Sequence, residues 1–298
     1  MEPYAAYLPI SWPWLGHSIE AASFLIFGWC AWDLRRQGRG EHIELFIAFV
    51  YGWLLEIFDM WIFGSYHYGP ATWAWLGPVP VYIPLLWATI IHSSMAISDR
   101  VGLPAWARPW MDGLLAVLID LAVDAIAIRV GLWHWKIPLN EGWFGVPAGN
   151  LYAWIWVAFW YSFTMRLVRE RITRRKDPAW HRFLVPVAAY VGLLTTLIGA
   201  GWLNIVLGWE SPNQRLRLFA VHVVVFCVIV WIAFASNNHR GENQLGAVPF
   251  SLRANRWLIH VSFFAILLAS GIGFAVPLLI VVSLASIIVE AVVHAQKV

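Results

Sequence analysis

The sequence predicts an all-α fold, a polytopic integral membrane protein built as a bundle of eight or nine transmembrane helices. The first observation is composition: the 298 residues are 60% hydrophobic and only 12% charged, whereas soluble domains carry about 25% charged residues. The second is the recurrence of apolar runs of about twenty residues, the length of a membrane span. The third is the confinement of basic residues to alternate loops. The whole chain, residues 1–298, is therefore expected to form one transmembrane domain.

The apolar runs give the expected positions of the helices. They cover residues 17–34, 42–64, 78–98, 110–131, 149–168, 183–207, 216–235, 255–271 and 274–294. Only Gly271-Ile272-Gly273 separates the last two, so these form either a tight hairpin or one broken helix. We expect a core over about residues 17–175 and additional helices over 183–298.

The distribution of Lys and Arg predicts the orientation. All but Arg129, Lys136, Arg215 and Arg217 fall in loops on one side of the nine-span arrangement. Because cytoplasmic loops carry the excess of basic residues, the amino terminus is expected outside and the carboxyl terminus in the cytoplasm of a bacterial inner membrane. Basic residues placed between apolar spans favour a lipid bilayer as partner and give no indication of nucleic-acid binding. Residues 166–182 and 236–256 are expected to be solvated loops that face the lipid headgroups. Glu44 is expected to be a helix-start acid, and Glu290 and His294, four residues apart, to form a local pair. The sequence indicates no oligomeric state.

Four acidic residues lie inside two of these spans. Glu56 and Asp59 are three residues apart and Asp120 and Asp124 are four apart, so each pair shares one helix face. A charge near the bilayer centre costs roughly 2.5–3.5 kcal/mol, so such residues usually face a protein interior or a wet cavity. At about 1.5 Å per residue, Glu56 and Asp124 both lie roughly 21 Å from the inner ends of their helices. The four carboxyls are therefore expected to meet in the outer half of the bilayer.

Two loops on the external side are expected to cap this region. Residues 66–80 and 131–149 hold many aromatic, Gly and Pro residues and almost no net charge. The chain also contains 22 tryptophans, of which we assign most to interfacial belts and the remainder to the walls of a cavity. The expected site is thus an aromatic chamber that holds four acids.

Crowded carboxyls in such a chamber cannot all ionise. A carboxylic acid that stays protonated in an apolar site can serve as a general acid, that is, as a proton donor. The acid could protonate a carbon–carbon double bond, and aromatic faces would stabilise the cation. Loss of a proton then gives isomerisation, capture by water gives hydration, and attack by a second double bond gives cyclisation. The catalytic candidates are Glu56, Asp59, Asp120 and Asp124, with no cofactor and no metal.

Other roles for these acids remain open. They could brace helices by pairing with His92 or Arg129. Asp120 and Asp124 could hold Mg²⁺ against a diphosphate, although the chain has one such DxxxD pair and mainly Arg129 near it. A proton-coupled transporter would also contain intramembrane acids, but the chain has no evident inverted repeat.

Two stretches of the chain resemble the CruF-like carotenoid biosynthesis proteins, hydratases that act on γ-carotene or bisanhydrobacterioruberin-type carotenoids. The resemblance covers about residues 45–160. The first stretch contains Glu56, Phe63-Gly64, Tyr66, Tyr68, Gly77, Val79-Pro80, Ile83-Pro84 and Trp87; the second contains Asp120-Leu121, Asp124, Gly131, Trp133, Trp135, Phe144-Gly145-Val146-Pro147, Asn150 and Trp154. One departure is Val123-Asp124-Ala125 where the family has Leu-Asp-Pro.

The resemblance implies an activity: addition of water across the terminal double bond of a lipophilic isoprenoid or carotenoid, without a redox cofactor. On this hypothesis Asp124 or Glu56 donates the proton, while Asp120 and Asp59 tune it or position water. The expected substrate-binding residues are Tyr66, His67, Tyr68, Trp87, His92, Trp133, Trp135 and Asn150. A membrane terpene or carotenoid cyclase is the first alternative, and a non-enzymatic binder of a polyene or lipid is the second.

Overall fold

The computed structural model describes residues 12–38, 40–236 and 247–295. Nine long helices occur in this part of the chain, one for each predicted span, and the predicted ends differ from the observed ends by a few residues. The elements are α1 (Pro13–Arg36), α2 (Glu41–Ile62), β1 (Tyr66–Tyr68), β2 (Trp75–Leu76), β3 (Val79–Pro80), α3 (Tyr82–Ser98), α4 (Arg108–Ala127), η2 (Ile128–Val130), β4 (Trp133–Trp135), α5 (Ala148–Arg175), η3 (Ala179–Leu184), α6 (Val185–Val206), α7 (Pro212–Ser236), α8 (Phe250–Ala269), α9 (Ile272–Ala275) and α10 (Pro277–Ala295).

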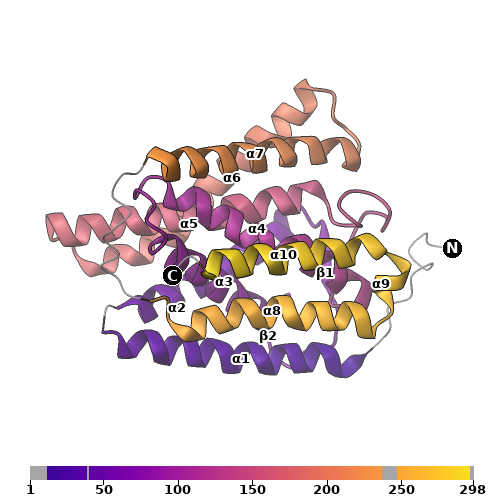
Figure 1. Cartoon of the computed structure of the whole chain (residues 1–298), viewed down its shortest axis with the longest axis horizontal. Helices are drawn as coiled ribbons and strands as arrows, with labels where there is room; N and C mark the ends of the chain where they lie inside the picture. The colour runs from indigo at the N-terminus through magenta and orange to yellow at the C-terminus, as the bar shows by residue number, and fades with distance from the viewer. Residues whose placement is uncertain (1–11, 39, 237–246, 296–298) are drawn as a thin grey trace.

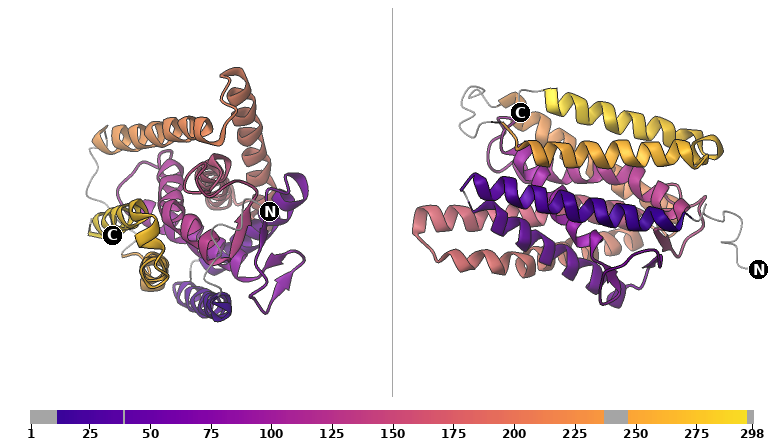
Figure 2. Two further views of the ribbon diagram at one scale, coloured as in Figure 1. Left: turned by 90° about the vertical axis from the view of Figure 1, so that its right-hand side faces the viewer. Right: turned by 90° about the horizontal axis from the view of Figure 1, so that it is seen from below.

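The long helices run side by side in one bundle (Figure 1). Helices α3 and α4 are the most enclosed: α3 packs against α1, α2, α4, α5 and α8, and α4 also contacts α7 and α10. The end-on view shows α1, α8, α10 and α7 around these central helices (Figure 2, left). Helices α8 and α10 pack against each other across the short α9, so the last two spans form a hairpin. The inner position of α3 and α4 lets their polar side chains avoid lipid.

Among the described residues, five helical segments are long and apolar enough to cross a membrane: α2, η3 with α6, α7, α8 and α10. This supports an integral membrane protein. The predicted eight or nine spans correspond to the nine long helices of the described residues, of which five have the length and apolarity of a membrane span. Helix α3 has only 17 residues. Helix α4 contains Asp112, Asp120 and Asp124, which lower its hydropathy although its neighbours in the bundle bury all three.

The two aromatic loops, residues 66–80 and 131–149, cover one end of the bundle. Strand β1 pairs antiparallel with β4, with Tyr66 opposite Trp135 and Tyr68 opposite Trp133, and β2 pairs with β3. The loop of residues 66–80 is also held against α1, because the Glu20 carboxylate accepts a hydrogen bond from the backbone N–H of Trp73 at 2.6 Å. These strands therefore form a fixed cap and not a solvated loop.

Part of the region predicted to be a solvated loop, residues 166–182, is helical, and two of its arginines are partly buried. Helix α5 continues to Arg175, so Arg166 and Arg169 lie on a helix face that meets the bundle. The Arg166 guanidinium lies 2.5 Å from Asp112 and 3.0 Å from Asp99. Arg169 pairs with Glu44, which the sequence suggested was only a helix-start acid. The prediction was wrong because it ended the helix where the apolar run ends, whereas α5 continues through arginines whose partners are carboxylates of other helices.

A second buried ion pair joins the C-terminal hairpin to the central helices. The side chains of Arg256 in α8 and Glu290 in α10 are both fully buried, with Arg256 Nε 2.5 Å from Glu290 Oε1. Arg256 also donates to Ser94 Oγ of α3 and to the Leu115 carbonyl of α4. The predicted local pair of Glu290 and His294 is confirmed at 2.8 Å. The prediction that residues 236–256 form a solvated loop was wrong for 250–256, which begin α8; residues 237–246 lie outside the described part.

We predict that Arg256→Met destabilises the protein strongly. Removing one partner leaves Glu290 charged and buried, which typically costs about 3–5 kcal/mol. The double change Arg256→Met with Glu290→Met should recover part of that loss, because neither charge then remains. The measurement is the melting temperature in detergent micelles. Arg171→Met, at an exposed position of α5, is the control; equal melting temperatures for the two single variants would contradict the prediction.

Candidate functional site

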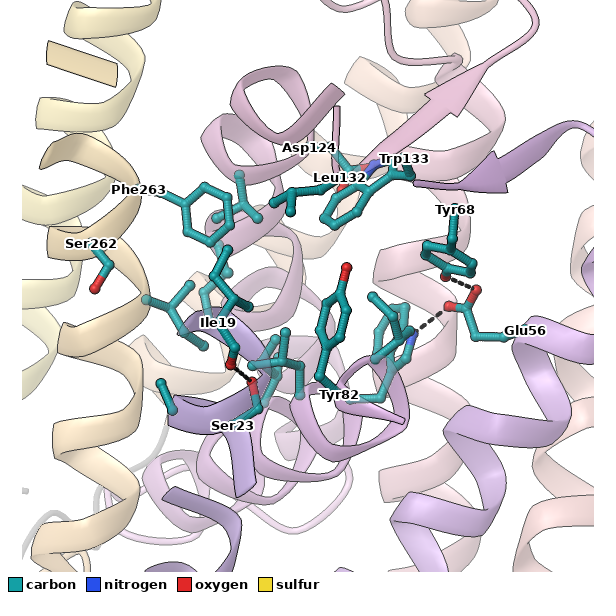
Figure 3. A pocket seen from close by; sticks show the side chains of 18 of the residues that line it. Ile19, Ser23, Glu56, Tyr68, Tyr82, Asp124, Leu132, Trp133, Ser262 and Phe263 are labelled. Carbon is teal, nitrogen blue, oxygen red and sulfur yellow. Dashed lines mark hydrogen bonds between the residues drawn. The ribbon is translucent and has the colours of Figure 1, made fainter. Parts of the chain in front are cut away.

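A cavity of about 330 Å³ lies beneath the cap, and its wall includes Glu56 of α2 and Asp124 of α4. Figure 3 shows Glu56 and Tyr68 at one side of this hollow, Asp124 and Trp133 above it, and Ser262 and Phe263 at the opposite side. The two helices that carry the predicted acid pairs thus contribute one carboxyl each to a common space. The other wall residues are mostly aliphatic and aromatic.

Glu56 accepts three hydrogen bonds from side chains. The Tyr66 and Tyr68 hydroxyls both donate to Oε2, and the Trp87 indole N–H donates to Oε1 at 2.7 Å. Burial, together with the Glu56 charge, raises the pKa of the Tyr66 and Tyr68 hydroxyls well above the usual range. Both hydroxyls therefore keep their protons and remain able to donate. Three donors around one carboxyl favour its ionised form.

The strand pair explains which cap residues reach the cavity. Residues at positions i and i+2 of a strand point to the same face, so Tyr66 and Tyr68 of β1 share the inner face with Trp133 and Trp135 of β4. His67 lies on the other face, is exposed, and contacts His134 with 5.1 Å between ring centroids. These four residues of the cap, together with Trp87 and Asn150, line the cavity, whereas His67 lies away from it.

Asp120 and Asp124 lie beside each other on α4 and share a partner. Asn150, in the first turn of α5, donates through Nδ2 to Asp124 Oδ2 at 2.5 Å and to Asp120 Oδ2 at 3.1 Å. Asp120 is fully buried and its Oδ1 has no hydrogen-bond partner among the described residues. Asp124 faces the cavity, whereas Asp120 lies behind it.

Two of the other predicted residues lie elsewhere. Asp59 is partly buried, accepts from Ser65 Oγ at 3.4 Å, and lines a neighbouring hollow together with Glu56. His92 is buried with its Nε2 4.0 Å from Glu41 of α2. Glu41 begins α2 and Glu56 lies near its end, so His92 belongs to the opposite end of the bundle. The spacing along α3 alone does not show this, because depth depends on where the helix starts.

Several wall residues were not among the predicted site residues. The Tyr82 hydroxyl points into the middle of the cavity (Figure 3) and has no hydrogen-bond partner in the described part of the chain. Trp154, which belongs to the second motif, packs on Trp87 with 4.1 Å between ring centroids. Ile259 and Phe263 come from α8. The sequence pattern of α8 predicts an apolar helix, but it does not predict which helices or cavities this helix packs against.

The cavity reaches the outer surface of the bundle between α1 and α8. Its wall there includes Leu25, which is 76% exposed, and Leu258, which is 45% exposed. Helices α1 and α8 pack side by side (Figure 1). A membrane would place hydrocarbon against these side chains, so a lipophilic molecule has an apolar route from the bilayer to the buried acids.

The apolar helices and this chamber define an integral membrane protein with a site suited to a lipophilic molecule. Residues 20–213 match the family described as carotenoid biosynthesis protein, and because this match covers more than half of the chain, the protein belongs to that family. No curated protein and no solved structure is significantly similar to the chain. The predicted resemblance is confirmed and extends further than residues 45–160, taking in most of α1 and all of α6.

The cavity is not formed by the family region alone. Leu258, Ile259, Ser262 and Phe263 of α8 complete its wall and lie beyond the matched residues. Within the described part of the chain, no group of three or more His, Cys, Asp or Glu side chains is arranged to hold a metal ion.

We predict that Gly52→Ala destabilises the protein and displaces Trp87 from Glu56. A Cβ at position 52 would lie 2.7 Å from the Trp87 Cβ, which lies next to the backbone of α3 and cannot rotate away. Helices α2 and α3 must then separate, at a cost of about 1–3 kcal/mol. The measurement is the melting temperature in detergent. Gly28→Ala on α1, where an added Cβ would meet no atom within 4 Å, is the matched control and should be neutral or slightly stabilising, because Ala is the better helix former.

Proposed function

We propose that the protein protonates a terminal double bond of a carotenoid or related isoprenoid and adds water to the resulting cation. The observation that carries this proposal is the pair of unlike carboxyls in one lipid-accessible cavity. Glu56 accepts from three donors, whereas Asp124 lies beside a second carboxyl. One site thus contains a group suited to accept a proton and a group suited to give one.

Asp124 is the proposed proton donor. Two adjacent buried carboxyls cannot both ionise without strong repulsion, so Asp120 and Asp124 hold at least one proton between them. Asn150 orients both carboxyls through its amide N–H groups. Since Asp124 is the member that lines the cavity, its proton can reach a bound alkene carbon, and Asp120 serves as the positioning residue behind it.

Glu56 is the proposed base. As an ionised carboxylate it would stabilise the cation and accept the proton that water loses when its oxygen bonds to the cationic carbon. The balance is one alkene and one water converted to one tertiary alcohol. To reset the site, Glu56 loses the proton that it took from water to solvent, and Asp124 takes up one proton from solvent, so both acids return to their starting states. No redox step is involved, and the roles of the two acids differ because their hydrogen-bond partners differ.

The aromatic wall supports the cation. Trp87, Trp133 and Tyr82 line the cavity around the two acids, and a cation over such a ring gains up to about 2 kcal/mol in a desolvated site. The remainder of a long polyene would lie along the apolar opening between α1 and α8. A cyclase would use the same acid and rings but exclude water, so the fate of the cation distinguishes the two functions.

We predict that Asp124→Asn and Glu56→Gln each lower turnover by at least about 100-fold, the usual contribution of a general acid or base. Each protein is to be incubated with a linear carotenoid carrying ψ-type end groups in H₂¹⁸O, and the products analysed by mass spectrometry. The wild type should form an ¹⁸O-labelled alcohol. Glu170→Gln, at an exposed position of α5, is the control.

The same experiment separates the alternatives. A ring-containing product without ¹⁸O would identify a cyclase. If the wild type binds the polyene without converting it, and both acid variants bind it equally well, the protein is a non-enzymatic carrier. Melting temperatures of the variants close to that of the wild type establish that lost turnover reflects chemistry and not unfolding.

A further inference from the structure

A second hollow of about 530 Å³ lies on the other side of the wall that holds Glu56. It is bounded by α2, α5, α6 and the first turns of α7, together with the cap residue Ser65. Six residues line both hollows: Glu56, Tyr66, Trp87, Trp135, Asn150 and Trp154. The proposed base and the residue that orients the proposed acid are therefore accessible from two directions.

The two hollows differ in the polarity of their approaches. The second contains Arg215, exposed at the start of α7, then Asn204 of α6, then Asp59 with Ser65. The approach to the first from α1 and α8 offers only two hydroxyls, and that of Ser23 already donates to the Ile19 carbonyl at 2.7 Å. Most of the second wall is apolar as well, but only the second approach carries charged and amide side chains, so it is the better suited of the two to admit water.

Unpaired polar atoms mark the second hollow and its wall. Asn204 Oδ1 and the Trp135 indole N–H are both buried and have no hydrogen-bond partner among the described residues. Buried polar groups in a space of this size are normally satisfied by water, which makes about three hydrogen bonds per molecule in protein interiors. A lipid chain in the same space would leave both groups unsatisfied.

We propose that the second hollow is an aqueous compartment that delivers water to the Glu56 side of the reaction site, while the hydrocarbon substrate enters from the opposite side between α1 and α8. This inference rests on the proposed hydration. Water would pass Arg215 and Asn204, reach Asp59, and meet the cation beside Glu56, which takes its proton as the C–O bond forms. Asp59 is thus a positioning residue on the water route and not a proton donor to the alkene.

The separation has a chemical consequence. A tertiary cation reacts with any water present. A chamber filled with solvent would also hydrate Asp124 and favour its ionised form, which has no proton to give to the alkene. Admitting water only past Glu56 keeps the acid in an apolar space and brings the nucleophile to the base. The partition between the alcohol and water-free products then depends on the second hollow.

Filling the second hollow tests this partition. Gly201 of α6 lines the hollow, and Gly199 on the same helix does not; a Cβ added at either position would meet no atom within 4 Å. Gly201→Phe should lower the ratio of ¹⁸O-labelled alcohol to water-free product several-fold, while total substrate consumption falls less. Gly199→Phe should leave the ratio unchanged.

Solvent access tests the same proposal without the reaction. In a Cys227→Ser background, with Cys30 buried, Gly201→Cys and Ala22→Cys place a thiol at the lining of the second and the first hollow respectively. A charged methanethiosulfonate reagent should label position 201 and not position 22. Pretreatment of Gly201→Cys with the reagent should lower the alcohol ratio as Gly201→Phe does.

The outcomes separate the two proposals. Unlabelled Cys at position 201, or an unchanged ratio in Gly201→Phe while the wild type still incorporates ¹⁸O, overturns the water route and leaves the hydratase standing. An equal effect of Gly199→Phe also overturns the route. Absence of ¹⁸O from the wild-type product overturns both proposals.

Discussion

The structure depends on the burial of the Glu56 carboxyl inside an apolar bundle. A carboxylate there is tolerated only with several hydrogen-bond donors around it. The donors come from two separate places: the Tyr66 and Tyr68 hydroxyls from β1, and the Trp87 indole from α3. Satisfying this one group therefore fixes the cap above α2 and α3, and holds α2 and α3 close to each other.

The rest of the site follows from that arrangement. Because Tyr66 and Tyr68 point inward, their cross-strand partners on β4, Trp135 and Trp133, point inward as well. Strand β4 follows α4 after the short η2, so the same pairing holds the end of α4 with Asp124 at the cavity, and Asn150 at the start of α5 closes the wall. Aromatic rings and two differently bonded carboxyls thus come together around a single space in a carotenoid biosynthesis protein.

The charged groups away from the site serve the bundle. Arg166 and Arg169 connect α5 to Asp112, Asp99 and Glu44 at one end, and Arg256 joins α8, α10, α3 and α4. These contacts bring α8 against the family region, where it completes the cavity wall. Sequence patterns placed these arginines in solvated loops because a charged residue near a helix end has the same local signature whether its partner is water or a buried carboxylate.

The sequence by itself determined the helices, their order, and the presence of acids at similar depth in two of them, because apolar run length and helical spacing are local properties. It also indicated the two capping loops and the family. Only the tertiary structure decided that Asp124 and Glu56 share a cavity and that Asp59 lines the neighbouring hollow. It also decided that His67 points away from the cavity and that His92 lies near Glu41 at the other end of the bundle. Those outcomes depend on the rotation of each helix about its axis and on strand register, which are set by packing between segments distant in the chain.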